Sequence, residues 1–134
     1  MPARTHDPRV LGAVAVGGAV GTLARAGLLE ALPADATGWP WPTFVANIVG
    51  AFLLGWFAVR LPPPERSPYA RPLLGAGFCG ALTTFSTLQL EVVDLAREGV
   101  PELAVAYMAV SAVLGVVVVA AATRIARRTG AAPA

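Results

Sequence analysis

The chain has 134 residues, of which 56% are hydrophobic and only 13% are charged. A soluble domain this small buries about two-thirds of the surface its unfolded chain exposes and carries roughly 25% charged residues, so this composition argues against a soluble globular enzyme. All ten basic residues are Arg, and the net charge of +2 is spread along the chain, which argues against nucleic-acid binding.

Four long apolar segments follow one another along the chain. Each has about the 20 residues that are needed to cross a hydrocarbon core about 30 Å thick. Short polar or proline-rich stretches separate them and are too short to be domains. The sequence therefore predicts an all-α membrane protein with one domain, residues 1–134, whose four transmembrane helices cover residues 10–32, 42–61, 72–95 and 101–126.

The first two segments each contain a polar residue that needs a partner within a membrane. Arg25 lies about two-thirds along the first segment, where it either extends to the interface or attracts an anion into a vestibule. Asn47 lies in the first half of the second segment, where its amide either holds helices together or donates hydrogen bonds to a permeating anion. Glycines four residues apart, such as Gly17 and Gly21, predict close helix packing.

The third segment is unusual because three glycines precede four hydroxyl residues. Gly75, Gly77 and Gly80 come first, and residues 83–87 read TTFST. This pattern indicates a helix that breaks within the membrane, where exposed backbone must be buried in protein or line a cavity. The alternative is a continuous glycine-rich helix whose hydroxyls bond to their own backbone.

Beyond the expected break, Thr84, Thr87 and Glu91 fall on one helical face. We interpret Glu91 as a carboxylate that simply lies near the membrane interface. In the fourth segment Tyr107 and Ser111 stand four residues apart and share a face, where each could make a plain hydrogen bond between helices.

The distribution of Arg predicts the orientation in the membrane. With four spans, the N-terminus, the second loop and the C-terminus share one side, which therefore faces the cytoplasm. The opposite side holds only Arg97, whereas the predicted cytoplasmic side holds Arg4, Arg9, Arg60, Arg66, Arg71, Arg124, Arg127 and Arg128.

No set of nucleophile, base and orienting residue is visible, so the sequence predicts no enzyme. From the residues alone, two classes of membrane protein compete with a channel. A small proton-coupled multidrug-type exporter matches in size, but it needs a protonatable carboxylate near mid-membrane. A non-transporting assembly subunit would use every polar group within the membrane to join helices.

Three motifs resemble those of one known family, the Fluc (CrcB) fluoride channels. They occur in the family order, and the resemblance extends over nearly the whole chain, although it is weakest in the fourth segment and the tails. The resemblance lies in residues 17–25 (GGAVGTLAR), 42–52 (PTFVANIVGAF) and 77–87 (GFCGALTTFST).

This resemblance implies a passive fluoride channel in the cell membrane that lowers fluoride in the cytoplasm. Members of the family are four-helix subunits that form antiparallel dimers with two pores and a structural sodium ion at the centre. By position, backbone carbonyls of Gly80 and Thr83 would hold the sodium, and Arg25 would be the vestibule arginine. The fluoride pore would be lined by Asn47, Phe85, Ser86, Thr87, Tyr107 and Ser111.

The sequence departs from the family pattern at two points. Leu88 stands where a second phenylalanine is usual, and a leucine has no aromatic ring to offer an anion. The Arg distribution predicts a single orientation, whereas a dual-topology homodimer needs similar numbers on both sides. We therefore hypothesise an antiparallel heterodimer, in which an oppositely oriented relative supplies the missing ring.

Overall fold

The computed structural model describes residues 7–130, and over that range its regular structure is entirely helical. In chain order the elements are α1 (Pro8–Ala31), α2 (Trp41–Arg60), the π-helix η1 (Pro72–Cys79), α3 (Gly80–Leu82), α4 (Phe85–Arg97) and α5 (Pro101–Thr129). The elements η1, α3 and α4 follow one another as a single candidate membrane span, Pro72–Arg97. The described residues therefore contain four candidate membrane spans, as the sequence predicts.

Prolines mark the start of every span, because a proline in the first helical turn removes an N–H that has no helical partner there. They are Pro8, Pro42, Pro72 and Pro101. Asp7 adds a cap at the start of α1, where its side chain accepts a hydrogen bond of 2.9 Å from the Arg9 N–H. Between α4 and α5 the chain reverses through Gly99, whose φ of +84° favours glycine.

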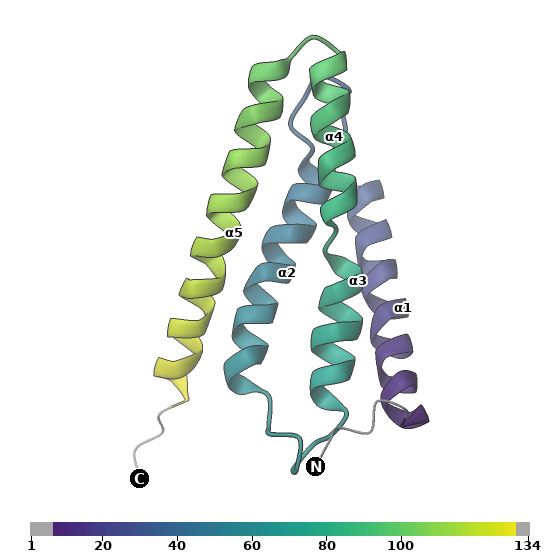
Figure 1. The fold of residues 1–134 in the computed structure, drawn as a ribbon, viewed down its shortest axis with the longest axis vertical. Coiled ribbons are helices and arrows are strands. Elements are labelled where there is room, and N and C mark those ends of the chain that lie inside the picture. Colours follow the sequence, from purple (N-terminus) through teal and green to yellow (C-terminus); the bar gives the residue numbers. More distant parts are fainter. Residues whose placement is uncertain (1–6, 131–134) are drawn as a thin grey trace.

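The spans lie side by side and alternate in direction (Figure 1). α1 begins and α5 ends at the same end of the molecule, which also carries the connection between α2 and η1. α1 packs mainly against η1 and α3, whereas α5 packs mainly against α2 and α4. α1 and α5 therefore form the two flanks of the arrangement in Figure 1.

Glycines allow the backbones of neighbouring spans to touch, as their four-residue spacing predicts. A Cβ atom at Gly17 would overlap the Leu73 carbonyl of η1, and one at Gly77 would lie 2.7 Å from the Val14 carbonyl oxygen. Gly55 has the same function between α2 and α5, because a Cβ there would lie 2.7 Å from the Val119 carbonyl oxygen. Any larger side chain at these positions must push two helices apart.

Gly17→Ala is expected to lower the free energy of unfolding by about 1–3 kcal/mol, because the added methyl group overpacks the contact between α1 and η1. Gly18→Ala is the matched control, since no atom lies within 4 Å of a Cβ at that position. Chemical denaturation of the detergent-solubilised protein measures both. Equal stability of the two variants would contradict the packing that we describe.

Candidate functional site

The third span is broken at Thr83 and Thr84, which are both in extended conformation. Thr83 has φ −82° and ψ 152°, and Thr84 has φ −149° and ψ 122°. The predicted break is therefore confirmed, and it includes Thr84, which the sequence analysis placed just beyond it. Gly75 and Gly77 lie within the π-helix that leads up to it. Two residues of extended backbone in a candidate membrane span expose polar groups that need partners.

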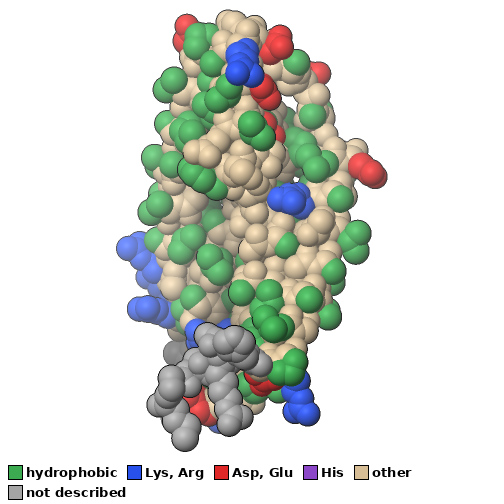
Figure 2. Space-filling view, turned by 45° about the vertical axis from the view of Figure 1, so that its right-hand side comes forward, with side chains coloured by type: hydrophobic (Ala, Val, Ile, Leu, Met, Phe, Trp, Pro, Cys, Tyr) green, Lys and Arg blue, Asp and Glu red, His purple; other side chains and the backbone are tan. Residues whose placement is uncertain are grey.

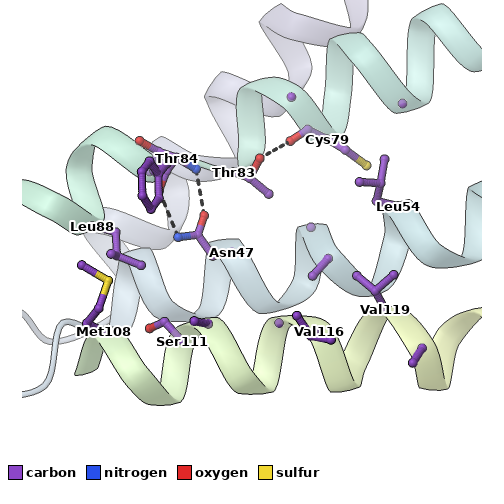
Figure 3. A pocket seen from close by; sticks show the side chains of 18 residues that line it. Asn47, Leu54, Cys79, Thr83, Thr84, Leu88, Met108, Ser111, Val116 and Val119 are labelled. Atoms are coloured by element: carbon purple, nitrogen blue, oxygen red, sulfur yellow. Dashed lines mark hydrogen bonds between the residues drawn. The ribbon is translucent and has the colours of Figure 1, made fainter. Parts of the chain in front are cut away.

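The side-chain amide of Asn47 supplies those partners for Thr84. Its Nδ2 donates to the Thr84 carbonyl at 3.0 Å, and its Oδ1 accepts from the Thr84 N–H at 2.8 Å. Figure 3 shows Asn47 reaching from α2 to the break along these two bonds. The interpretation that this amide holds helices together is confirmed. The amide group has two N–H donors, and the bond to the Thr84 carbonyl uses only one of them.

Two backbone carbonyls lose their helical donors at the break. In a continuous helix the Gly80 carbonyl would accept from the Thr84 N–H, which here is bonded to Asn47 instead. The Thr83 carbonyl would accept from the Thr87 N–H, which is bonded to Thr84 Oγ1 at 3.2 Å. The break thus leaves these two oxygens without the N–H groups that a regular helix provides.

The hydroxyl groups beyond the break cap the start of α4. Thr84 Oγ1 lies 2.9 Å from Thr87 Oγ1 and 3.4 Å from Ser86 Oγ, in addition to its bond with the Thr87 N–H. Between them Phe85 is 67% exposed, and its ring is therefore not covered by the rest of the subunit. The first turn of α4 therefore directs the exposed side chains of Phe85 and Ser86 away from the core.

A cavity of about 750 Å³ lies beside the break and is lined by the third span on one side and by α2 and α5 on the other (Figure 3). None of its lining residues is charged. Five residues predicted for the site line it: Asn47, Gly80, Thr83, Phe85 and Ser111. The predicted residues Ser86, Thr87, Tyr107 and Arg25 are not among the lining residues, and α1, which carries Arg25, contributes none.

Glu91 is at the centre of a second polar cluster. Its Oε1 accepts a hydrogen bond of 2.6 Å from Thr43 Oγ1, and its Oε2 accepts one of 2.7 Å from the Tyr107 hydroxyl. Tyr107 is completely buried and Thr43 is 2% exposed. Glu91 thus joins three helices, a role that the sequence analysis did not predict; its position near the interface stays a prediction. The sequence analysis missed Thr43, although its position four residues before Asn47 predicts a shared face.

Ser111 and Leu88 complete the wall of the cavity on the side of this cluster. Ser111 is 8% exposed, and its hydroxyl has no hydrogen-bond partner among the described residues. Leu88 is 5% exposed and packs with Tyr107 in the main hydrophobic cluster. The residue that replaces the usual phenylalanine is thus part of the core of this subunit as well as of the cavity wall.

The fold and the site together define a small membrane protein of four spans, with a broken third helix beside an uncharged cavity. Residues 12–123 match the family described as CrcB-like protein, Camphor Resistance (CrcB), and the chain belongs to this family. It is 52% identical over 126 residues to "Fluoride-specific ion channel FluC 1" of Mycobacterium bovis. The aligned region covers 92% of this chain and 94% of that protein. It is 41% identical over 118 residues to "Fluoride-specific ion channel FluC 2" of Thermobifida fusca, which covers 85% of this chain and 87% of that protein. With "Fluoride-specific ion channel FluC" of Methanopyrus kandleri it is 40% identical over 112 residues, 83% of this chain and 84% of that protein.

Asn47→Leu is expected to lower the free energy of unfolding by about 2–4 kcal/mol, because it leaves both the Thr84 N–H and the Thr84 carbonyl without their partner. Thr83→Val is the control. It removes only the 2.9 Å bond from the Thr83 hydroxyl to the Cys79 carbonyl, which keeps the Thr83 N–H as a donor. Denaturation in detergent compares the two variants. If Thr83→Val lost as much stability as Asn47→Leu, the Asn47 amide would not be the main support of the break.

Proposed function

We propose that this chain is a subunit of a fluoride-specific ion channel, through which fluoride leaves the cytoplasm passively. The observation that carries this proposal is the uncharged cavity beside the break, into which the Asn47 amide and the Ser111 hydroxyl bring hydrogen-bond donors. The family membership and the printed function of the relatives support the same conclusion. In this proposal residues 1–134 act as one transmembrane domain.

The pore works by replacing the water of a strongly hydrated small anion. Amide N–H and hydroxyl groups are suitable donors, and a fixed positive charge in the lining would hold the ion too tightly for conduction. Asn47 and Ser111 provide such donors from within the cavity, and the hydroxyls of Ser86 and Thr87 continue the path. Tyr107 stands beside the path, but its single hydroxyl hydrogen is donated to Glu91. Phe85 adds the positive edge of an aromatic ring, and Arg25 draws anions to the entrance.

The active form is an antiparallel dimer with two such pores. The main support for a dimer is the apolar surface beside the break. Phe85 and Val116 line the cavity there, and they are 67% and 72% exposed. A second subunit in the opposite orientation covers this surface and closes each cavity into a pore. Because Leu88 lies in the core of its own subunit, the partner supplies any second ring.

A structural sodium ion lies at the centre of the dimer, held by the backbone carbonyls of Gly80 and Thr83. Hard cations prefer oxygen ligands, and unwound backbone in membrane transporters provides them. The loss of the helical N–H donors at these two carbonyls supports the assignment. Two antiparallel subunits would contribute four such oxygens to one ion.

Both termini face the cytoplasm. The end of the molecule at which α1 begins and α5 ends holds seven described arginines and the acids Asp7 and Glu65, and Arg4 lies outside the described residues. The opposite end holds Arg97 with five acids, which are Glu30, Asp35, Asp94, Glu98 and Glu102. Figure 2 shows basic side chains mainly toward one end and acidic side chains mainly toward the other. This asymmetry favours one orientation, so in the cell the partner is a related chain inserted in the opposite direction.

The two competing classes find less support. A proton-coupled exporter needs a carboxylate that faces its substrate, but no acidic residue lines the cavity. Glu91 instead has each oxygen bonded to a hydroxyl donor. An assembly subunit would have its polar groups paired within the protein, whereas the buried hydroxyl of Ser111 has no partner among the described residues.

Liposomes that contain the purified chain and internal fluoride are expected to release fluoride rapidly, and to retain chloride. Detergent extraction removes the bias of membrane insertion, so antiparallel pairs can form during reconstitution. A fluoride electrode measures the release, which should continue after any pH gradient is collapsed. Ser111→Ala is expected to reduce the rate about tenfold through the loss of one hydrogen bond, whereas Thr123→Val, outside the cavity lining, should not. Fluoride retention by a reconstituted dimer would contradict the proposal.

The orientation predicts the outcome of a topology assay with a C-terminal reporter in intact cells. Nearly all of the reporter should be cytoplasmic. Replacement of Arg124, Arg127 and Arg128 by Gln should move a measurable fraction to the other side, because these arginines retain the end of α5. Arg97→Gln is the control and should not reduce the cytoplasmic fraction. Equal populations in the wild type would mean that the chain forms its antiparallel pair without a relative.

A further inference from the structure

Two buried side-chain polar atoms have no hydrogen-bond partner among the described residues: Ser111 Oγ and Trp39 Nε1. Both lie next to the same side chain, that of Tyr107. Ser111 is one helical turn beyond Tyr107 on α5. The rings of Trp39 and Tyr107 meet edge to face, with centroids 5.3 Å apart and planes at 84°. Two unpaired donors thus flank one tyrosine.

The environment of Trp39 differs from that of a tryptophan at a membrane interface. Interfacial tryptophans direct the indole N–H toward the polar boundary. Trp41 is 46% exposed and suits that position, whereas the N–H of Trp39 is buried against the protein. An indole N–H is a donor only, and a buried donor without an acceptor loses the hydrogen bond that water gave it. Such a group calls for an acceptor that the protein itself does not provide.

Contacts connect the proposed pore with this indole. Leu88 lines the cavity and belongs to the buried hydrophobic cluster, and Trp39 and the cavity-lining Met108 both pack against that cluster. Ser111 lines the same cavity from α5. The carboxylate of Glu91 accepts from the hydroxyls of Thr43 and Tyr107 but makes no hydrogen bond with the indole, whose Nε1 has no partner among the described residues. The two unpaired donors therefore both lie beside Tyr107: Ser111 is in the cavity wall, and Trp39 packs against the cluster to which the cavity-lining Leu88 belongs.

We infer that the indole N–H of Trp39 is a further fluoride-binding donor, which receives the ion after Ser111 on the path toward the α4–α5 end of the molecule. The inference rests on the proposed channel function and adds to it a station in the connection between α1 and α2. Fluoride fits this station because a small anion with a dense charge accepts a strong hydrogen bond from a single N–H. The rings of Phe44 and Tyr107 hold the indole in place, each meeting it edge to face at 5.3 Å.

Nuclear magnetic resonance of the reconstituted full chain, labelled with ¹⁵N-tryptophan, tests the contact directly. The chain has three tryptophans and therefore three indole N–H signals. Addition of sodium fluoride should shift the Trp39 indole proton strongly downfield and leave the Trp41 signal in place, and sodium chloride should shift neither. Trp39→Phe and Trp41→Phe assign the signals. A Trp39 signal that does not respond to fluoride would overturn the inference.

Fluoride efflux from liposomes gives the functional test. Trp39→Phe keeps an aromatic ring and removes only the N–H donor, so the rate should fall about tenfold, which corresponds to one hydrogen bond of roughly 1.4 kcal/mol. Trp41→Phe makes the same change at the exposed neighbour and should stay within about twofold of the wild type. Equal rates in the two variants would overturn the inference, whereas a wild type without efflux would refute the channel function itself. If Trp39→Phe does not fold, the resonance experiment on the wild type still decides.

Discussion

The pair of hydrogen bonds between the Asn47 amide and the Thr84 backbone is the interaction on which the site depends. Water is absent from the core of a bilayer, so an extended stretch of chain there needs a partner for each polar group. The amide of asparagine offers a donor and an acceptor side by side, and it reproduces the pairing that a neighbouring peptide would give. With this support the third span can change direction at Thr83 and Thr84 without leaving those groups of Thr84 unpaired.

The close packing of glycine keeps the broken span in position. The half before the break touches α1 through Gly17, Gly21 and Gly77, where backbone meets backbone. At the break itself, a Cβ at Gly50 of α2 would overlap the Thr83 side chain. α2 therefore supports the break in two ways: the Asn47 amide bonds to Thr84, and Gly50 leaves room for the Thr83 side chain. α1 supports η1 from outside, which explains why it carries no residue of the cavity wall.

Hydropathy predicts the four spans to within a few residues, because membrane thickness determines their length. Proline and glycine also mark the ends of helices and the region of the break. The partners of Glu91 are harder to predict, since Thr43 lies 48 residues away in the sequence and only the packing of α2 against α4 brings them together. Trp39 belongs to a short connection that has no helical period, so no spacing rule relates it to Tyr107. The dimer surface and the ion sites remain predictions that depend on the family resemblance.

In the proposed channel, Leu88 stands where the family resemblance implies a phenylalanine, and this changes how the pore works. A leucine adds apolar surface but has no aromatic ring edge with positive charge. An anion beside it therefore finds no favourable interaction to replace the water molecules that it has lost. In this subunit Leu88 is 5% exposed and fills space next to Tyr107, where its size suits the core. In the proposed pore, hydrogen-bond donors of this subunit must then replace more of the water that fluoride loses. Ser111 and Trp39 carry the unpaired buried donors, and a subunit that offers fewer aromatic edges has greater need of them.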